Sequence, residues 1–354
     1  MMPSLMTDDR DIGGPAQPLL SVKHVVRHFP LGNKGLPFLK DARNVVRAVD
    51  NISFDVLKGE TLGVVGESGC GKSTMARLMM QLLLQDSGEL IFDGEMVGSR
   101  ALPLREFRRQ VQMVFQDSFS SLNPRMTIED SVAFGATVHG VSPKDAIARG
   151  RDLLARVGLD PVRFAGRYPH ELSGGQRQRV NIARALALGP RLVILDEAVS
   201  ALDKSVEAQV LNLLADLKAE FGLTYVFISH DLNVVRYISD RLVVMYLGEI
   251  VEIGTAEDVF AHALHPYTRA LLNSMPSVDP TRRTSVAPLF GDPPNPIDPP
   301  SGCRFHTRCP QAQDVCSKRV PAVSTVDGGQ VTCLEYEPDS GYVPISIAAA
   351  QELA

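Results

Sequence analysis

Short apolar runs alternate with helix-forming segments along most of the chain, and this alternation predicts the order of strands and helices. The predicted strands, rich in apolar and β-branched residues, are 22–29, 45–56, 62–65, 192–195, 225–228 and 242–245. Helix-forming segments follow several of these strands, at 73–84, 206–220 and 232–238. Strands that alternate with helices in this way favour an α/β fold with a largely parallel central sheet.

The pattern changes in other parts of the chain, and these changes suggest how it is divided. Helical stretches, notably 128–134 and 144–157, replace the alternation in the middle of the sequence. After Met275, eight prolines within 25 residues predict an extended linker. The predicted division is a flexible tail, an ordered domain that contains a helical subdomain, and a C-terminal extension, at 1–18, 19–260 (with the subdomain at about 118–178) and 261–354.

Composition and charge exclude some function classes. The chain has 354 residues, of which 44% are hydrophobic, and its 36 basic and 41 acidic side chains give a formal charge of −5. This balance argues against a protein that binds nucleic acid through phosphate neutralisation. Apolar stretches such as 242–247 are far shorter than the roughly 18 residues that a membrane helix needs. Asp8, Asp9 and Asp11 oppose a signal peptide, so we expect a cytosolic protein.

A glycine-rich loop between the predicted strand 62–65 and the predicted helix 73–84 carries the first chemical signal. Its sequence matches the phosphate-binding pattern G-x-x-x-x-G-K-[ST]. Glycines let backbone N–H groups turn toward phosphates, Lys72 reaches the β and γ phosphates, and the Ser73 hydroxyl can bind Mg²⁺. Cys70 is interpreted as a small residue that the loop tolerates. The candidate nucleotide-binding residues here are Gly66, Ser68, Gly69, Cys70, Gly71, Lys72, Ser73 and Thr74.

Two carboxylates follow the predicted strand 192–195. Asp196 lies at the strand tip, where it would hold Mg²⁺ together with Ser73, and Glu197 is placed to act as a general base toward the attacking water. Two acids after a strand usually form a solvated turn, but a phosphate loop in the same chain reverses that expectation. Together the two motifs predict a Mg²⁺-dependent NTP hydrolase.

The sequence Leu172-Ser173-Gly174-Gly175-Gln176 resembles the signature motif of ATP-binding cassette (ABC) ATPases. The resemblance implies that Gln116 contacts Mg²⁺ and couples to the helical subdomain, that Asp203 belongs to the D-loop, and that His230 contacts the γ-phosphate. It also gives Phe29 as the aromatic residue that stacks on adenine. In this family the signature residues Ser173, Gly174, Gly175 and Gln176 close over the nucleotide of the opposite subunit. The resemblance therefore implies a head-to-tail dimer with two ATP molecules at its interface.

A second resemblance covers the C-terminal part of the chain. The segments 265–272 and 302–310, with the sequences HPYTRALL and GCRFHTRCP, look like the C-terminal extension of oligopeptide and dipeptide importer ATPases. This implies a peripheral ATPase subunit on the cytoplasmic face of the inner membrane. The implied complex contains two permease chains, a second ATPase subunit and, indirectly, an extracytoplasmic peptide-binding protein. The transported solute stays open, as does the choice between a homodimer and a heterodimer of cassettes.

Four of the five cysteines, Cys303, Cys309, Cys316 and Cys333, cluster near the C-terminus, with five, six and sixteen residues between them. This spacing is irregular compared with a zinc ribbon, and four thiolates suit either an iron–sulfur cluster or zinc. Reduced thiols or a disulfide are the remaining alternatives. The family resemblance favours a [4Fe–4S] cluster.

A soluble ABC ATPase that acts in DNA repair or translation is the alternative function. Such proteins usually carry a long coiled-coil insertion or two cassettes, whereas this sequence has one phosphate loop and no such insertion. A binding module with an inactive site is disfavoured because Lys72, Asp196, Glu197 and His230 are all present. We therefore predict an α/β P-loop ABC ATPase core with a helical subdomain and a proline-rich, cysteine-containing C-terminal extension, which uses ATP and Mg²⁺ to drive peptide import.

Overall fold

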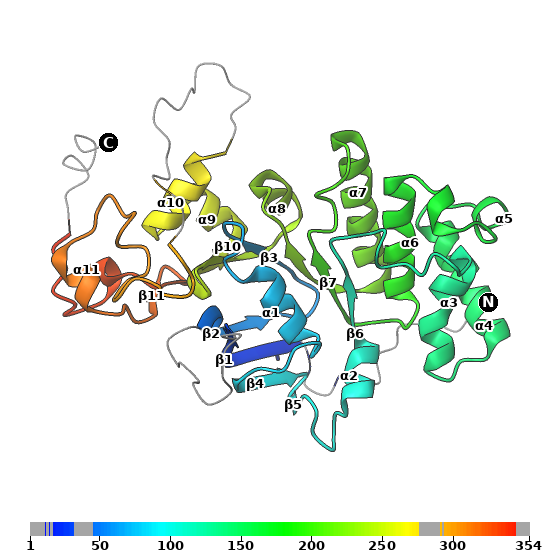
Figure 1. Ribbon diagram of the computed structural model, residues 1–354, viewed down its shortest axis with the longest axis horizontal. Coiled ribbons are helices and arrows are strands. Elements are labelled where there is room, and N and C mark those ends of the chain that lie inside the picture. Colours follow the sequence, from blue (N-terminus) through cyan, green and yellow to red (C-terminus); the bar gives the residue numbers. More distant parts are fainter. Residues whose placement is uncertain are drawn as a thin grey trace.

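The computed structural model describes residues 11, 14, 17–31, 45–275, 291 and 294–344. Figure 1 shows two sheets in the middle of the molecule, a group of helices at one end, and an orange segment from the C-terminal part of the chain at the other end. Much of the predicted tail and of the predicted proline-rich linker lies outside the described residues.

A large mixed sheet forms the centre of the molecule. Its strands are β3 (Thr61–Val65), β6 (Val111–Val114), β7 (Leu192–Asp196), β8 (Thr224–Ile228), β9 (Arg241–Tyr246), β10 (Glu249–Thr255), β11 (Ser324–Val326) and β12 (Gly329–Val331). Their order across the sheet is β11-β12-β10-β9-β3-β8-β7-β6. The five strands from β9 to β6 are parallel, and every residue of β3, β7 and β8 is buried, as expected for strands covered on both faces. The predicted α/β fold with a largely parallel sheet is confirmed.

The C-terminal part of the chain adds strands to the edge of this sheet. β10 pairs with β9 and β12 in antiparallel direction, and β11 continues the sheet beyond β12. Glu252 of β10 lies opposite Val331 of β12. The segment after residue 320 therefore belongs to the same hydrogen-bonded sheet as the central parallel strands.

A second sheet is antiparallel and has the strand order β2-β1-β4-β5. Its strands are β1 (Leu20–Pro30), β2 (Val45–Val56), β4 (Ser87–Phe92) and β5 (Glu95–Met96). The sequence pattern predicts β1 and β2 but misses β4 and β5. Val22 of this sheet, Met75 of helix α1 (Lys72–Met79) and Val64 of the central sheet belong to one buried core. The helix and its loop are thus held between the two sheets.

Helix α1 ends at Met79, so the predicted end at residue 84 is wrong. Gln81 has a φ of 54°, a left-handed conformation through which a right-handed helix does not continue. Leu82 N then donates a hydrogen bond to Arg77 O at 2.9 Å, which closes the turn. The residues 82–84 have helix-forming side chains, but the backbone has already reversed before them.

The helices on the right of Figure 1 are α3 (Ile128–Val138), α4 (Pro143–Arg156), α5 (Pro161–Phe164) and α6 (Gly174–Leu186). The first three lie within the predicted helical subdomain, about 118–178, and α6 begins there and continues beyond it. Thr127 and Ser142 cap the first two helices, because their side chains accept hydrogen bonds from the backbone N of Asp130 and Asp145. The remaining helices are α2 (Leu104–Gln110), α7 (Lys204–Phe221), α8 (Leu232–Ile238), α9 (Ala256–His262), α10 (Pro266–Asn273) and α11 (Asp314–Lys318).

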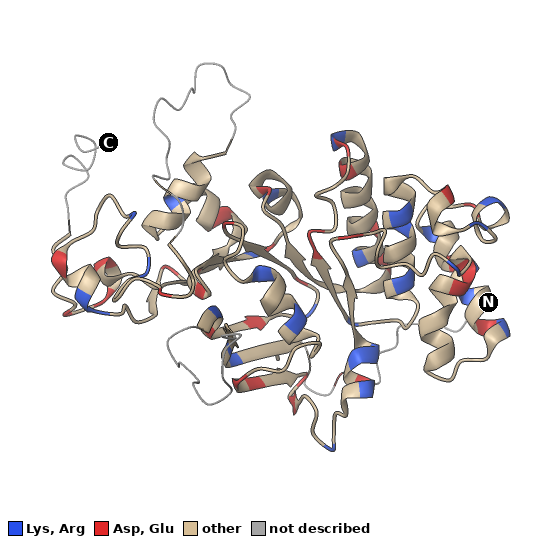
Figure 2. Cartoon of the chain, in the orientation of Figure 1, with Lys and Arg blue, Asp and Glu red and all other residues tan. Residues whose placement is uncertain are grey.

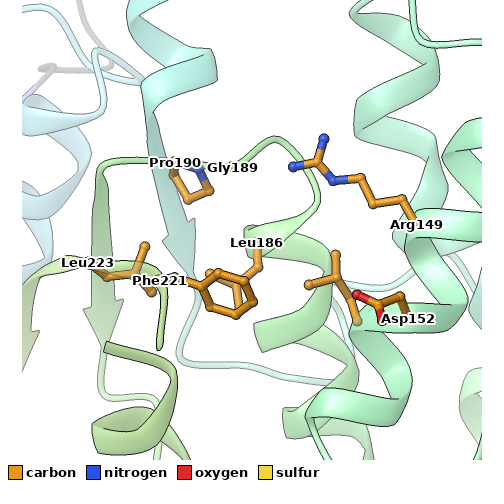
Figure 3. Close-up of a pocket in the computed structure, with 8 residues that line it drawn as sticks. Arg149, Asp152, Leu186, Gly189, Pro190, Phe221 and Leu223 are labelled. Atoms are coloured by element: carbon orange, nitrogen blue, oxygen red, sulfur yellow. The ribbon is translucent and has the colours of Figure 1, made fainter. Parts of the chain in front are cut away.

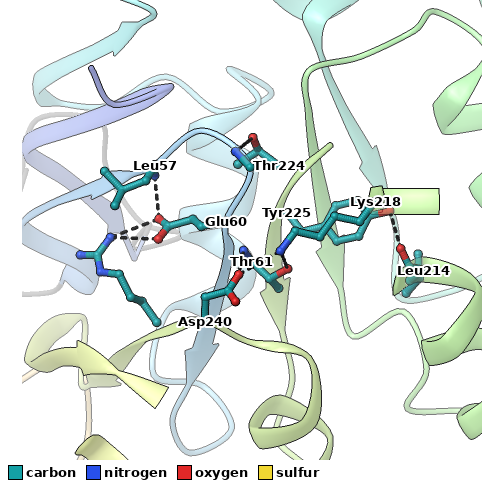
Figure 4. Close-up of polar contacts among 10 residues, drawn as sticks. Leu57, Glu60, Thr61, Leu214, Lys218, Thr224, Tyr225 and Asp240 are labelled. Carbon is teal, nitrogen blue, oxygen red and sulfur yellow. Dashed lines mark hydrogen bonds and ion pairs between the residues drawn. The ribbon is translucent and has the colours of Figure 1, made fainter. Parts of the chain in front are cut away.

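Polar contacts hold the starts of the central strands (Figure 4). Thr61 N, at the start of β3, donates to Asp240 Oδ2 at 2.7 Å, and Lys218 Nζ of α7 donates to the same oxygen at 2.9 Å. The Arg241 guanidinium lies 3.1 Å from the Glu60 carboxylate, next to Thr61. Because these contacts fix the start of β3, they also fix where the loop at its other end begins.

Lys and Arg residues lie among Asp and Glu residues in the two sheets, in the group of helices at one end and in the C-terminal segment at the other end (Figure 2). This distribution matches a chain whose formal charge is only −5. Within the described residues, no helix combines the length and the apolar character that crossing a bilayer requires.

Candidate nucleotide-binding site

A pocket of about 610 Å³ lies at the carboxyl ends of the central parallel strands, the edge at which α/β sheets bind ligands. The loop after β3, Gln116 after β6, Glu197 after β7 and His230 after β8 all line it. Every lining residue except Val46 and Ala48 is one that the sequence predicts. The complete lining is Phe29, Val46, Ala48, Ser68, Gly69, Gly71, Lys72, Ser73, Thr74, Gln116, Glu197 and His230.

Glycines allow the loop between β3 and α1 to turn tightly. Gly66, Gly69 and Gly71 have φ angles of 150°, 80° and 109°. A Cβ atom at Gly71 would lie 2.1 Å from Ala48 O, and one at Gly66 would lie 2.2 Å from Met245 O. Any side chain at these two positions would force the loop away from the neighbouring backbone.

Lys72 is the first residue of α1, and its side chain is buried. Its Nζ donates hydrogen bonds to Gly66 O at 2.7 Å and to Glu67 O at 2.9 Å. A buried ammonium group needs such acceptors, and these two hold its charge against the loop. A phosphate placed over the loop meets this charge together with the free N–H groups at the helix start.

Ser73 Oγ donates a hydrogen bond to Asp196 Oδ1 at 3.1 Å, which joins the start of α1 to the tip of β7. Burial raises the pKa of the Asp196 carboxyl, and the hydrogen bond from Ser73 opposes this shift. A carboxylate and a hydroxyl are the oxygen ligands that Mg²⁺ prefers in nucleotide sites. These two residues therefore fit a magnesium site beside the phosphate loop.

Glu197 is held between two other side chains at the edge of the pocket. Gln116 Nε2 donates to Glu197 Oε2 at 2.7 Å, and His230 Nδ1 lies 3.5 Å from Glu197 Oε1. The Glu197 backbone has a φ of 48°, and its N donates to Ile228 O at 3.0 Å. A non-glycine residue keeps this costly conformation only where its surroundings hold it. These contacts hold the carboxylate at the edge of the pocket, and its role as a general base stays a prediction.

The second sheet supplies the opposite wall of the pocket. Phe29, near the end of β1, pairs with Val46 of β2, and both line the pocket together with Ala48. The Arg27 guanidinium lies 4.9 Å from the centroid of the Phe29 ring. An aromatic ring at this place offers a stacking surface for a nucleobase. No sequence motif marks Val46 or Ala48, which reach the pocket because their strand pairs with that of Phe29.

The signature residues lie at the start of α6, outside this pocket. Gln176 N donates to Ser173 Oγ at 3.3 Å, and Ser173 N donates to Gln176 Oε1 at 3.0 Å, which forms a reciprocal cap. Gly174 and Gly175 follow as the first two residues of the helix. Asp203 directly precedes α7 without a side-chain capping hydrogen bond, and it is likewise not part of the pocket. Within one chain, these predicted residues are not brought to the phosphate loop.

Gly66 and Cys70 are also absent from the lining of the pocket. Gly66 acts through its carbonyl, which accepts from Lys72 Nζ. The Cys70 side chain is buried below the loop, and this burial raises the pKa of its thiol. Both residues therefore shape the loop from its inner side.

The four C-terminal cysteines line one separate pocket. All four are free thiols, and burial raises the pKa of Cys303 to about 11 and the pKa values of Cys309 and Cys333 to about 12. Among the residues that the structure describes, no group of three or more His, Cys, Asp or Glu side chains could hold a metal ion. The cysteines converge, and the metal centre itself stays a prediction.

A further groove, shown in Figure 3, marks the joint between the helical subdomain and the core. Arg149 and Asp152 come from α4, Leu186 ends α6, and Phe221 ends α7. Its lining is mainly apolar, and it shares no residue with the nucleotide pocket.

The fold and the pocket together define a P-loop NTP-binding protein. Comparison with protein families narrows this class. The family model described as "ABC transporter" matches residues 49–200, and the model described as "Oligopeptide/dipeptide transporter, C-terminal region" matches residues 251–316.

Relatives match over nearly the whole chain. The oligopeptide transport ATP-binding protein AppF of Bacillus subtilis (strain 168) is 49% identical over 310 residues, which are 86% of this chain and 92% of that protein. The oligopeptide transport ATP-binding protein OppF of Salmonella typhimurium (strain LT2) is 46% identical over 325 residues, 90% of this chain and 97% of that protein. The chain belongs to the family of ABC transporter ATP-binding proteins, and it is an ATPase of the ABC type.

Solved structures agree with this fold. The cbiO1 protein of Clostridium perfringens, part of the ABC transporter complex cbiONQ, has a TM-score of 0.59 and 29% identity, and the match covers 69% of this chain and 91% of that one. A dimeric ATP-binding cassette, MJ0796 bound to ADP and Pi, has a TM-score of 0.57 and 28% identity over 67% of this chain and 98% of that one.

Proposed function

We propose that this chain hydrolyses ATP to drive the import of di- or oligopeptides, as the motor subunit of a membrane complex. One observation carries the proposal: Lys72, the Ser73–Asp196 pair and Glu197 converge at one pocket. The names of the relatives AppF and OppF support peptides as the transported class. We assign ATP binding to the domain 19–260, whose helical subdomain at about 118–178 passes the motion to the permeases, and we treat 261–354 as the C-terminal extension of this family.

ATP binding follows from the arrangement of the pocket. Phe29 stacks on the adenine, and the phosphates lie over the loop, where Lys72 and the amides at the start of α1 balance their charge. Ser73, Asp196 and Gln116 would hold Mg²⁺, which neutralises charge on the β and γ phosphates when it is bound.

Hydrolysis depends on the group around Glu197. Its carboxylate takes a proton from the attacking water, which makes the water a better nucleophile toward the γ-phosphate. Gln116 and His230 orient this carboxylate, since both lie within 3.5 Å of its oxygens. His230 also contacts the γ-phosphate, so it joins the state of the nucleotide to the position of the base.

The signature helix serves a second cassette. Ser173, Gly174, Gly175 and Gln176 form a helix start with free N–H groups, and such a start binds anions. We infer that these residues close over the γ-phosphate of a partner ATPase subunit, a homologue or another copy, and that Asp203 lies at the same interface. The dimeric form of the similar cassette MJ0796 supports this arrangement.

The complex would contain two transmembrane permease chains and receive peptide from an extracytoplasmic binding protein. Within the described residues this chain has no helix suited to span a bilayer. We therefore place it at the cytoplasmic face of the inner membrane, attached through the permeases. The alternative of a soluble ATPase in DNA repair or translation is not favoured, because the relatives named here are transport proteins.

The cysteine pocket would hold a [4Fe–4S] cluster through Cys303, Cys309, Cys316 and Cys333. The type and number of donors suit such a cluster, since four free thiols line one pocket, while the described side chains form no ready group for a single metal ion. The raised pKa values mean that binding must release protons from the thiols.

Reconstitution tests the proposed function. The chain is purified from detergent-solubilised membranes with its partners, and ATP-dependent peptide uptake into proteoliposomes is measured. We expect permeases and a second cassette to co-purify, and we expect uptake that Lys72→Ala abolishes. Co-purification with ribosomes or DNA-repair proteins, without permeases, would support the soluble alternative instead.

A further inference from the structure

The C-terminal segment contacts the phosphate loop directly. Arg308 forms a two-pronged ion pair with Glu67, with 2.8 Å between NH1 and Oε2 and 3.0 Å between NH2 and Oε1. Glu67 is the second residue of the phosphate loop, and its side chain does not line the nucleotide pocket. The Arg308 side chain is only 6% exposed and that of Glu67 21%, so this pair is screened little by solvent.

A second contact holds the same residue by its backbone. Glu67 N donates a hydrogen bond to the Tyr267 hydroxyl at 2.9 Å, and Tyr267, from α10, is fully buried. The carbonyl of Glu67 accepts a hydrogen bond from Lys72 Nζ at 2.9 Å. The Glu67 backbone therefore lies directly between the C-terminal segment and the lysine that faces the phosphates.

The other wall of the nucleotide pocket is held by the same short segment. Arg304, four residues before Arg308, forms ion pairs with Asp50 of β2 and, at 2.9 Å, with Glu249 of β10. His28 of β1 lies 3.1 Å from Asp50. Since β1 and β2 also carry Phe29, Val46 and Ala48, the turn 304–308 ties the base-stacking wall to the phosphate loop.

Aromatic packing makes this turn rigid. The Phe305 ring lies 5.3 Å from Tyr246 and 5.4 Å from Tyr267, edge to face in both cases. Phe305 is buried, and its neighbours in sequence, Arg304 and Arg308, point their charges to the two walls of the site. Buried T-shaped aromatic pairs fix ring orientation well.

We propose that Arg308 and Tyr267 are positioning residues for ATP binding, which hold Glu67 so that Lys72 and the loop amides keep their phosphate-binding geometry. This inference rests on the proposed ATP site and adds a regulator of its affinity. Cys303 and Cys309 flank the same turn, so the cysteine pocket is joined to the phosphate loop through one rigid segment. Loss of Arg308 also leaves the partly buried Glu67 carboxylate without this partner, which favours a shift of the loop toward solvent.

The test measures steady-state ATPase activity against ATP concentration, ATP affinity by titration with a fluorescent ATP analogue, and thermal unfolding, all with the full-length chain. For Arg308→Met we expect KM and Kd for ATP to rise about tenfold, with kcat within about twofold of the wild-type value, because Glu197 and its neighbours are untouched. Glu67→Gln should have a similar effect. The double variant should bind no more weakly than Arg308→Met alone, because both changes break the same contact.

Arg319→Met is the matched control. Arg319 forms an ion pair with Glu337 inside the C-terminal segment, and neither residue contacts the phosphate loop in the described structure. We expect its KM to stay at the wild-type value. Equal KM values for Arg308→Met and Arg319→Met would overturn the proposal. The proposal would also be overturned if the increase in Kd of the Glu67→Gln, Arg308→Met double variant equalled the product of the increases in the two single variants.

Tyr267→Phe covers the case in which Arg308→Met does not fold. It removes one hydroxyl and keeps the ring packing, and we expect Kd for ATP to rise about threefold to fivefold, the effect of one hydrogen bond. An unchanged Kd would remove Tyr267 from the role. If the wild-type protein binds ATP and all the variants bind it equally well, this inference is refuted and the proposed function stands. If the wild-type protein does not bind ATP, both the proposed function and this inference are refuted.

Discussion

Replacing Glu197 with glutamine tests the assignment of the general base most directly, because it changes the charge and leaves the shape. The Glu197 side chain is only 16% exposed, with Gln116 Nε2 2.7 Å from one oxygen and His230 Nδ1 3.5 Å from the other. A glutamine at this place can keep its amide oxygen toward Gln116 and turn its amide nitrogen toward His230. The substitution therefore costs at most one hydrogen bond, about 1 kcal/mol of folding stability.

The expected loss of turnover is much larger than that. A positioned general base contributes roughly 10²–10⁴-fold to a rate, which corresponds to about 2.7–5.4 kcal/mol of activation free energy. ATP binding should be retained, because the change removes a negative charge near the phosphates and leaves Lys72 and Ser73 in place. We therefore expect kcat to fall by about 10²–10⁴ and Kd for ATP to change by less than about threefold.

The assay combines phosphate release at saturating ATP with titration of a fluorescent ATP analogue. Glu129→Gln is a suitable control, because Glu129 forms an ion pair with the exposed Arg151 in the helical subdomain, away from the pocket. We expect this control to hydrolyse ATP at the wild-type rate. If Glu197→Gln retained more than about a tenth of wild-type turnover, Glu197 would not be the base.

Lys72→Ala should weaken ATP binding by about 10–100-fold, as expected from the loss of a charge-assisted contact, and should also lower the unfolding temperature because Gly66 O and Glu67 O lose their donor. Cys309→Ser should lose bound iron and the broad absorbance near 400 nm that the proposed cluster would give, and unchanged iron content would contradict the cluster. Burial lowers the pKa of His265 from 6.5 to about 3 in the folded chain. Between pH 6.5 and pH 3, the imidazole is therefore protonated in the unfolded chain and neutral in the folded chain, so the free energy of unfolding falls as the pH drops through this range. When the pH is lowered from 7 to 5, the free energy of unfolding of the wild-type chain should fall by about 2 kcal/mol more than that of His265→Asn, which keeps an acceptor for Tyr267 N but does not titrate in this range. Urea denaturation at the two pH values measures this difference.

The central strands and the nucleotide pocket are predictable from sequence because their signals are local. β3, β7 and β8 are short buried runs, and Ser68, Glu197 and His230, which line the pocket, follow them within about three residues. Parallel strands bring such residues to one edge, so the order of motifs along the chain is enough to assemble the pocket.

Three two-residue hairpins show which turns could be predicted from the sequence and which could not. Asp93-Gly94 between β4 and β5 and Asp327-Gly328 between β11 and β12 have left-handed φ angles at both residues, the turn that Asp-Gly favours in a two-residue hairpin. These strands were therefore predictable, although they are too short for apolar alternation to mark them. Leu247-Gly248, between β9 and β10, makes the same turn with φ angles of 45° and 83°, but leucine gives no such signal.

The contact between Arg308 and Glu67 could not be predicted from the sequence, for a different reason. The phosphate-binding pattern fixes glycine, lysine and a hydroxyl residue, because phosphate contact requires them, and leaves the positions of Glu67 and Cys70 open. In the fold, these two side chains do not line the pocket: Glu67 contacts Arg308, and Cys70 is buried near Tyr267. Glu67 and Cys70 are thus the open positions through which a segment about two hundred or more residues away can act on the loop without touching the nucleotide.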